Sequence, residues 1–235
     1  MDINLSSVLE RAEQFARDLD AEYDVCLRTK ALSPTLQQLT HDVAEKLSSA
    51  LDRAAFRYWS LHVRPTLADA IAAKAERSIY FPAPDAVDDL QSQLGKWRMK
   101  DAGVDQSQIA AFLQTFIAPG HQWLRDTRII ANEGKHVGLT PQRHFREERV
   151  FAERGGARVS WTPAAVRFGD GVRIAGLPVN PQTQMPEAAP EMFVRHEVYT
   201  GFIVEKIGRE LQEFVKAAVP NTRLLVTKMS DQFGL

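Results

Sequence analysis

At 235 residues with 44% hydrophobic residues, the chain can bury a sizeable core, and this composition excludes an intrinsically disordered protein. Lysine and arginine number 29 against 30 for aspartate and glutamate, so the net charge of -1 gives no overall field that attracts a phosphate backbone or an anionic membrane. Any role in nucleic-acid binding therefore depends on a local patch.

Cysteine usage and the N-terminal sequence indicate a compartment. Cys26 is the only cysteine, so the chain forms neither an intramolecular disulfide nor a zinc site of several cysteines. The N-terminus is acidic, and no apolar run approaches the roughly eighteen residues of a membrane span. The sequence therefore predicts a cytoplasmic protein with no signal peptide and no membrane contact.

Two long helices joined by a short turn are predicted first. Apolar residues recur at steps of three and four over about 7–29, and Ser7 begins a sequence with capping-box spacing. Ser33, followed by proline at the first helical position, starts a second helix that should end near His62. Such a pair forms an antiparallel hairpin.

The middle of the chain has weaker patterns. An alanine-rich helix is expected over about 66–77. The region 85–103 carries many charged and polar residues, which indicates an exposed excursion with a short helix near 87–97. Either Asp105 or Ser107 can cap the next helix.

From about Gln142 the sequence changes to short runs rich in β-forming residues. The glycines at 155–156 and 169–171 are hairpin signals between these runs. The proline-rich stretch 177–190 is expected to be an irregular loop, and 191–200 to be one more strand. These elements predict a small antiparallel sheet.

Helical periodicity returns after the predicted strands. It predicts a closing helix over about 203–219 that Pro220 ends, with 224–226 able to form a short edge strand. The fold class is therefore α+β and predominantly helical. We expect an antiparallel helical bundle over 1–140, and over 141–235 a small antiparallel β unit plus the closing helix packed on the bundle.

The stretch 121–136 concentrates the candidate chemistry. If it is helical, Arg128, Asn132 and His136 lie four residues apart on one polar stripe. A histidine that is oriented by a partner such as Asn132 can act as a general acid or base. The alternative is a capping or core histidine, because Gly134 can end the helix before it.

The residues around His136 also carry a resemblance. Asn132-Glu-Gly-Lys-His136 followed by Leu139 resembles the Asn-x-x-Lys-His-x-x-Leu signature of a widespread set of bacterial proteins without an assigned function. The helix Asp42–Trp59 and the motif Ile79–Pro82 are similar to segments of the same set. The resemblance spans most of the chain and implies no activity.

A more distant likeness is to HEPN domains, which are helical bundles whose Arg-Asn-x-x-x-His motif cleaves RNA without metal. Asn132 and His136 match the asparagine and histidine of that motif, but Ala131 stands at the position of its arginine. Arg128 could replace that arginine, which stabilises the phosphorane charge. The resemblance leaves two hypotheses: a metal-independent ribonuclease, or a degenerate member that only binds.

Several charged residues are candidates for binding, and no cofactor or metal is expected. His41-Asp42 invites comparison with metal-dependent phosphohydrolases, but no histidine precedes it. Asp42 is better interpreted as a polar partner of a neighbouring helix. Residues 125–158, with the binding candidates Arg125 and Lys135, hold eight basic against five acidic side chains, which either contact RNA or pair with one another.

The leading hypothesis is a cytoplasmic interaction protein that binds a protein partner or RNA, with the ribonuclease as its rival. A homodimer is also expected. Trp123, Leu124 and Ile129 lie on different faces of one helix, so a second subunit is a natural cover for those outside the core.

Overall fold

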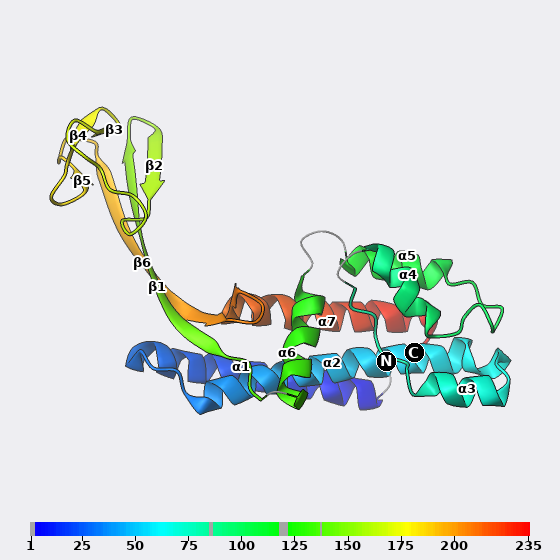
Figure 1. The fold of residues 1–235 in the computed structure, drawn as a ribbon. Coiled ribbons are helices and arrows are strands. Elements are labelled where there is room, and N and C mark those ends of the chain that lie inside the picture. The colour runs from blue at the N-terminus through cyan, green and yellow to red at the C-terminus, as the bar shows by residue number, and fades with distance from the viewer. Residues whose placement is uncertain (1–2, 85–86, 118–121, 137) are drawn as a thin grey trace. The chain divides into compact units, whose positions relative to one another are not determined.

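The computed structural model describes residues 3–84, 87–117, 122–136 and 138–235, and the side chains at 3, 87–88 and 134–136 lie outside the described part (Figure 1). The fold is α+β and mainly helical, as predicted. The chain divides into two compact units. We call residues 1–143 and 203–235 the helical unit and residues 144–202 the β unit.

The N-terminal hairpin has the predicted form. Helix α1 spans Ile3–Thr29 and α2 spans Pro34–His62, and the Ser33 side chain caps α2 by accepting a hydrogen bond of 3.0 Å from the Leu36 N–H. The predicted capping box at Ser7 is wrong. Since α1 begins at Ile3, Ser7 lies inside the helix and donates instead to the Asn4 carbonyl at 3.0 Å.

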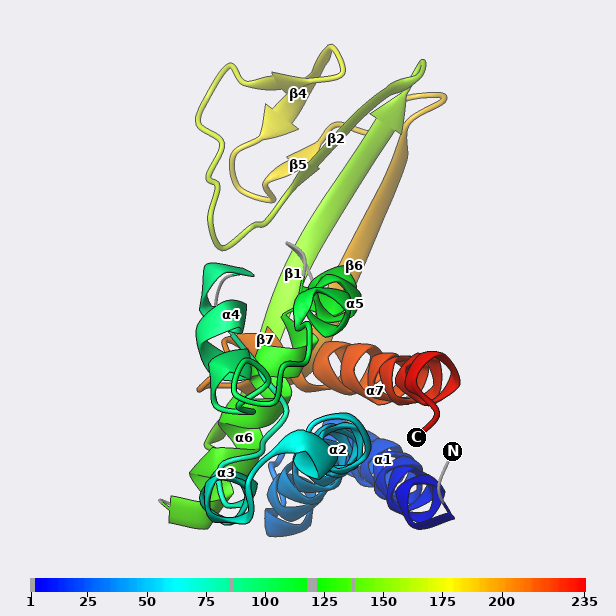
Figure 2. The same cartoon turned by 90° about the vertical axis from the view of Figure 1, so that its right-hand side faces the viewer.

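Helix α2 is the central element of the helical unit. It contacts α1, α6 (Trp123–His136) and α7 (Leu211–Phe233), and Figure 2 shows these helices around it. Its buried residues recur at steps of three and four, so they form a wide apolar face that packs against three neighbouring helices. They are Leu36, Thr40, Val43, Ala44, Leu47, Ser48, Ala50, Leu51, Ala54, Ala55, Tyr58 and Trp59.

The expectation of an exposed excursion over 85–103 is wrong, although the short helix is present. A 3-10 turn at Arg64–Thr66 and helix α3 (Asp69–Glu76) lead into α4 (Val87–Gly95), and α5 (Ser107–Ile117) follows. Four large apolar residues scattered among the polar ones are each at most 1% exposed. They are Leu90, Leu94, Trp97 and Met99.

Helix α6 is buried more completely than its sequence indicated. Trp123 and Leu124 are only 2% and 3% exposed, and Ile129 is half-buried. The premise that these side chains need a second subunit is therefore wrong. Since α6 contacts α2 and α7, core lies on more than one of its faces.

The C-terminal helix differs from its prediction at both ends. Residues 203–204 finish strand β6, and α7 starts only at Leu211. The helix also continues through Pro220 to Phe233, so the predicted strand at 224–226 is wrong. Pro220 is exposed, so its ring does not face the core, and the buried positions continue beyond it. Because α7 packs on α1, α2 and α6, it belongs to the helical unit.

The β unit is formed mainly by three strands. They are β1 (Gln142–Arg154), β2 (Ala157–Trp161) and β6 (Phe193–Val204), which with the short β7 (Arg209–Glu210) form a sheet in the order β2-β1-β6-β7. The glycines at 155–156 have positive φ and form the predicted hairpin turn between β1 and β2.

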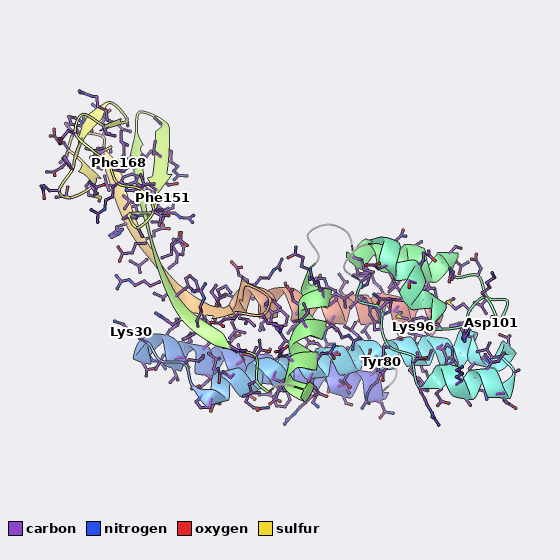
Figure 3. All side chains as sticks on the ribbon, in the orientation of Figure 1. Lys30, Tyr80, Lys96, Asp101, Phe151 and Phe168 are labelled. Atoms are coloured by element: carbon purple, nitrogen blue, oxygen red, sulfur yellow. The ribbon has the colours of Figure 1, made fainter. Side chains whose placement is uncertain are left out.

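The stretch 177–190 contains strands, so its prediction as an irregular loop is wrong. Three short strands, β3 (Arg173–Ile174), β4 (Leu177–Asn180) and β5 (Met185–Pro186), form a second antiparallel sheet. A core of Val150, Ala152, Trp161, Ile174 and Val179 stabilises the β unit. Phe168, labelled in Figure 3, packs edge-on against Trp161 with ring centroids 5.4 Å apart.

Candidate functional site

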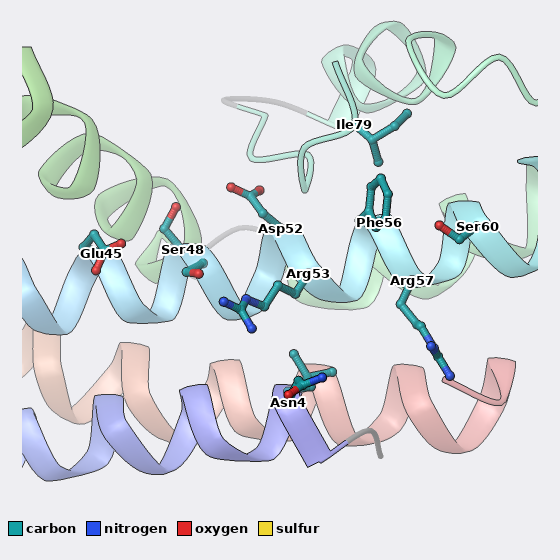
Figure 4. Close-up of a pocket in the computed structure, with 11 residues that line it drawn as sticks. Asn4, Glu45, Ser48, Asp52, Arg53, Phe56, Arg57, Ser60 and Ile79 are labelled. Atoms are coloured by element: carbon teal, nitrogen blue, oxygen red, sulfur yellow. The ribbon is translucent and has the colours of Figure 1, made fainter. Parts of the chain in front are cut away.

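A cavity of about 530 Å³ lies along α2 in the helical unit (Figure 4). Its walls come from α2, from the start of α1 and from the segment that follows α3. The lining residues are Asn4, Leu5, Glu45, Ser48, Ser49, Asp52, Arg53, Phe56, Arg57, Ser60 and Ile79. Figure 4 shows Phe56 and Ile79 pointing toward one another, whereas Arg53 and Arg57 extend toward the α1 side.

One wall of this cavity is fixed by an ion pair between α6 and α2. The Arg128 guanidinium donates from Nη1 to Oδ2 of Asp52 at 2.9 Å and from Nη2 to Oδ1 at 2.7 Å. It also donates to Ser48 Oγ at 2.8 Å and to the Phe81 carbonyl at 3.0 Å. Asp52 Oδ1 in turn accepts from the Phe81 N–H at 2.8 Å. The pair therefore joins α6, α2 and the segment after α3.

The acidic groups of the cavity have their own cations. Asp52 is neutralised by Arg128, and the Glu45 carboxylate lies 2.6 Å from the Lys46 ammonium. Arg53 is exposed, and within the described part of the chain no hydrogen bond or ion pair engages its guanidinium. The cavity therefore carries an excess of positive charge.

Two predicted site residues of α6 have different surroundings. Arg128 is directed to α2 and to the Phe81 carbonyl, and its side chain is only 20% exposed. Asn132 is exposed. No hydrogen bond between described residues joins them, and the side chains of Lys135 and His136 lie outside the described residues.

The other binding candidates lie elsewhere on the helical unit. Asp42 accepts a hydrogen bond of 2.8 Å from Gln38 on its own helix, so the acidic partner of Arg128 is Asp52 rather than Asp42. Arg125 is exposed on α6. Neither Asp42 nor Arg125 lines the cavity.

The sequence argument missed the cavity, although a signal was present. Glu45, Ser49, Arg53 and Arg57 recur every four residues on α2, so they form a polar stripe beside the buried one. Phe56 is next to this stripe and is 39% exposed. A large aromatic residue beside unburied polar positions could have indicated a binding surface.

Asp126 is the buried acid of α6, with 5% of its surface exposed. Its Oδ2 atom lies 3.3 Å from Nε of Arg209, which also donates to Gln122. Burial raises the pKa of the Asp126 carboxyl, and the charges of Arg209 and Arg125 offset this only in part. Ionisation of this carboxyl is therefore less favourable in the folded protein than in the unfolded chain.

The Asp126→Asn variant is expected to be the more stable protein at pH 7, with a higher Tm than the wild-type protein, because it removes a buried charge. Because the folded pKa lies above the unfolded value, the native state binds the proton more tightly. The wild-type protein therefore loses stability as the pH rises from the unfolded-state pKa of this carboxyl through its folded-state pKa. Thermal melts at pH 7 should show the gain, and it should shrink toward pH 4. The exposed Asp20→Asn is the control, and a lower Tm of Asp126→Asn at pH 7 would contradict the prediction.

The basic stretch on the strands is largely paired internally. Arg149 contacts Glu147 at 2.9 Å, and Arg146 contacts Glu148 at 2.6 Å. Across the hairpin, Nε of Arg158 lies 3.3 Å from Glu153. These pairs agree with the interpretation in which the charges of the strands neutralise one another.

Metal-ligating side chains are dispersed in the described part of the chain. No group of three or more His, Cys, Asp or Glu residues gathers there. His41 and Asp42 do not share a partner, because Asp42 accepts from Gln38 whereas the buried Nδ1 of His41 has no hydrogen bond to a described residue.

The described helices also include none with the length and hydrophobicity that a bilayer crossing requires.

The Asn-x-x-x-His spacing lies near the C-terminal end of α6, and Ala131, at the position of the HEPN arginine, is fully buried. No protein-family model, curated protein or solved structure matches the chain.

Proposed function

We propose that the protein is a cytoplasmic binding module without catalytic activity, and that its α2 cavity holds an acidic side chain of a protein partner. The observation that carries this proposal is the exposed Arg53, which has no acidic partner among the described residues. An arginine in such a position is a ready donor for a carboxylate.

The remaining lining residues suit a peptide rather than a bare anion. Ser49 and Ser60 offer hydroxyl groups that can donate or accept hydrogen bonds. Phe56 and Ile79 form an apolar side of the same cavity (Figure 4). An acidic residue with an apolar neighbour would therefore meet both kinds of surface.

The metal-independent ribonuclease of HEPN type is the second candidate, and the exposed Asn132 favours it. Two observations favour binding over cleavage. Arg128 is engaged by Asp52, Ser48 and Phe81, so its donors are not free to stabilise a phosphorane. Ala131 is fully buried, and its side chain carries no charge.

Reversing the charge of Arg53 is expected to weaken binding of an acidic peptide by at least about tenfold, since a charge-assisted hydrogen bond is replaced by repulsion. The probe is a fluorescein-labelled dodecapeptide of alternating glutamate and leucine, and the readout is fluorescence anisotropy. Arg53→Glu is compared with Arg17→Glu, an exposed α1 residue that does not line the cavity. If the two variants bound the peptide with equal affinity, the cavity would have no support as the peptide-binding site.

The ribonuclease is tested separately with labelled single-stranded RNA in the presence of a chelator. On the binding proposal the purified protein leaves the RNA intact. Cleavage that is abolished by His136→Ala would instead support the HEPN-type activity and contradict our proposal.

We also propose that the protein is a homodimer, and the surface that supports this assembly is the free edge of β6.

A further inference from the structure

Strand β6 leaves most of one edge without a strand neighbour. It lies between β1 and β7, but β7 pairs only with Ile203 and Val204. Among described residues, no backbone hydrogen bond outside the strand ladders reaches 193–200. Their amides and carbonyls on that edge are therefore available for another strand.

The same part of β6 exposes apolar side chains on both faces of the sheet. Phe193 is 75% exposed and Tyr199 is 42% exposed on one face. Val194 and Val198 are 41% and 47% exposed on the other. A free edge with apolar side chains is the kind of surface to which a β-strand is added.

The sequence of this edge is complementary to itself. Reading outward from His196 in Phe193-Val-Arg-His-Glu-Val-Tyr199, a valine balances a valine, an aromatic residue balances an aromatic residue, and Arg195 balances Glu197. We propose that β6 pairs with β6 of a second copy of this chain, antiparallel and with the two His196 residues opposite each other. This inference specifies the surface of the homodimer proposed above.

In this arrangement the directly opposed pairs on either side of His196 are favourable. One face carries Phe193 against the partner's Tyr199, and Arg195 against the partner's Glu197. The other face carries Val194 against the partner's Val198. Aromatic pairs, β-branched pairs and opposite charges each stabilise antiparallel strands by about 0.2–1 kcal/mol.

Charge selects this register over its alternatives. Shifting the pairing by two residues in either direction places Glu197 opposite the partner's Glu197, or Arg195 opposite the partner's Arg195. A shift of one residue opposes backbone groups that point toward β1 to groups that point outward, so it forms no ladder. Parallel pairing in register opposes each charge to itself. The proposed register is the one that satisfies both charges.

The charges of β6 can turn to a partner at small cost. Within one chain, Nε of Arg195 lies 2.7 Å from Glu197 on the same strand, and the two side chains are 63% and 27% exposed. The guanidinium also lies over the Phe151 ring, 5.0 Å from its centroid. Because Arg195 is exposed in this pair, exchanging it for the pair across the interface needs little further desolvation of the guanidinium.

The test is a charge exchange read out by sedimentation velocity on the full chain at about 1–100 µM, a range chosen for a single strand-to-strand interface. The wild-type protein is expected to approach twice the 26.4 kDa of one chain. Arg195→Glu or Glu197→Arg alone should weaken dimerisation at least about tenfold, since each places two like-charge pairs in the interface. Arg28→Glu, an exposed residue of α1 in the helical unit, is the control.

Mixing the two single variants should restore the dimer, because an acidic edge then faces a basic edge. The double variant Arg195→Glu/Glu197→Arg should restore it as well. Recovery of the dimer mass also shows that both single variants are folded. A monomeric wild-type protein across this range would overturn both the homodimer and this surface. A dimer that persists in both single variants, or is not recovered on mixing, would overturn the β6 surface alone.

Discussion

Arg128→Ala is expected to lower the free energy of unfolding by about 3 kcal/mol, at the lower end of the range for breaking a buried ion pair. The Arg128 and Asp52 side chains are 20% and 23% exposed, so removal of the arginine leaves a largely desolvated carboxylate without its cation. The variant also loses the hydrogen bonds to Ser48 and to the Phe81 carbonyl. Urea denaturation followed by circular dichroism measures the change.

The control is Arg28→Ala, which removes an exposed arginine of α1 and should change stability by no more than about 0.5 kcal/mol. The double variant Asp52→Ala/Arg128→Ala should be more stable than the sum of the two single losses indicates, because it leaves no unpaired charge. If Arg128→Ala were as stable as Arg28→Ala, the ion pair would not be what holds α6 on α2.

The parts of the fold that were predictable depend on local patterns. The start of α2 was predictable because Ser33 and the following proline form a cap that needs only adjacent residues. The turn at 155–156 was predictable for the same reason, since its glycines adopt positive φ. In both cases the determining interaction lies within a few positions of sequence.

The C-terminal helix shows where local rules are insufficient. Proline removes one backbone donor and normally ends a helix. Here Pro220 is exposed, whereas Leu225 and Val226 beyond it are fully buried. Burial of these residues against the bundle offsets the cost of the proline, and that term depends on tertiary contacts rather than on the local sequence.

The candidate site could be predicted only in part. Arg128 was identified as a candidate from its spacing on α6, but its partner Asp52 is 76 positions away in sequence. The cavity has the same character, because α1, α2 and the segment after α3 meet only in the folded chain. The helical pattern of one sequence shows which residues share a face but not which helix that face meets.

Trp97→Ala is expected to lower the free energy of unfolding by about 4 kcal/mol, since a fully buried aromatic side chain is replaced by a cavity. Trp97 is 1% exposed, and its ring lies 5.7 Å from that of Tyr58. Its Nε1–H donates to the Tyr80 carbonyl at 3.2 Å, and its own carbonyl accepts from Trp59 at 3.0 Å. Thermal melts should show a decrease in Tm of roughly 8–16 °C.

Two further variants separate the contribution of the ring from that of its hydrogen bond. Trp97→Phe retains most of the apolar volume and loses the N–H donor, so it should cost only about 1–2 kcal/mol. Lys96→Ala changes the exposed neighbour and should stay within about 0.5 kcal/mol of the wild-type protein. The series therefore distinguishes two descriptions of residues 85–103. If Trp97→Ala were as stable as Lys96→Ala, the segment would be the exposed excursion that its polar sequence indicates. A large decrease in the free energy of unfolding would instead establish the segment as part of the core on α2.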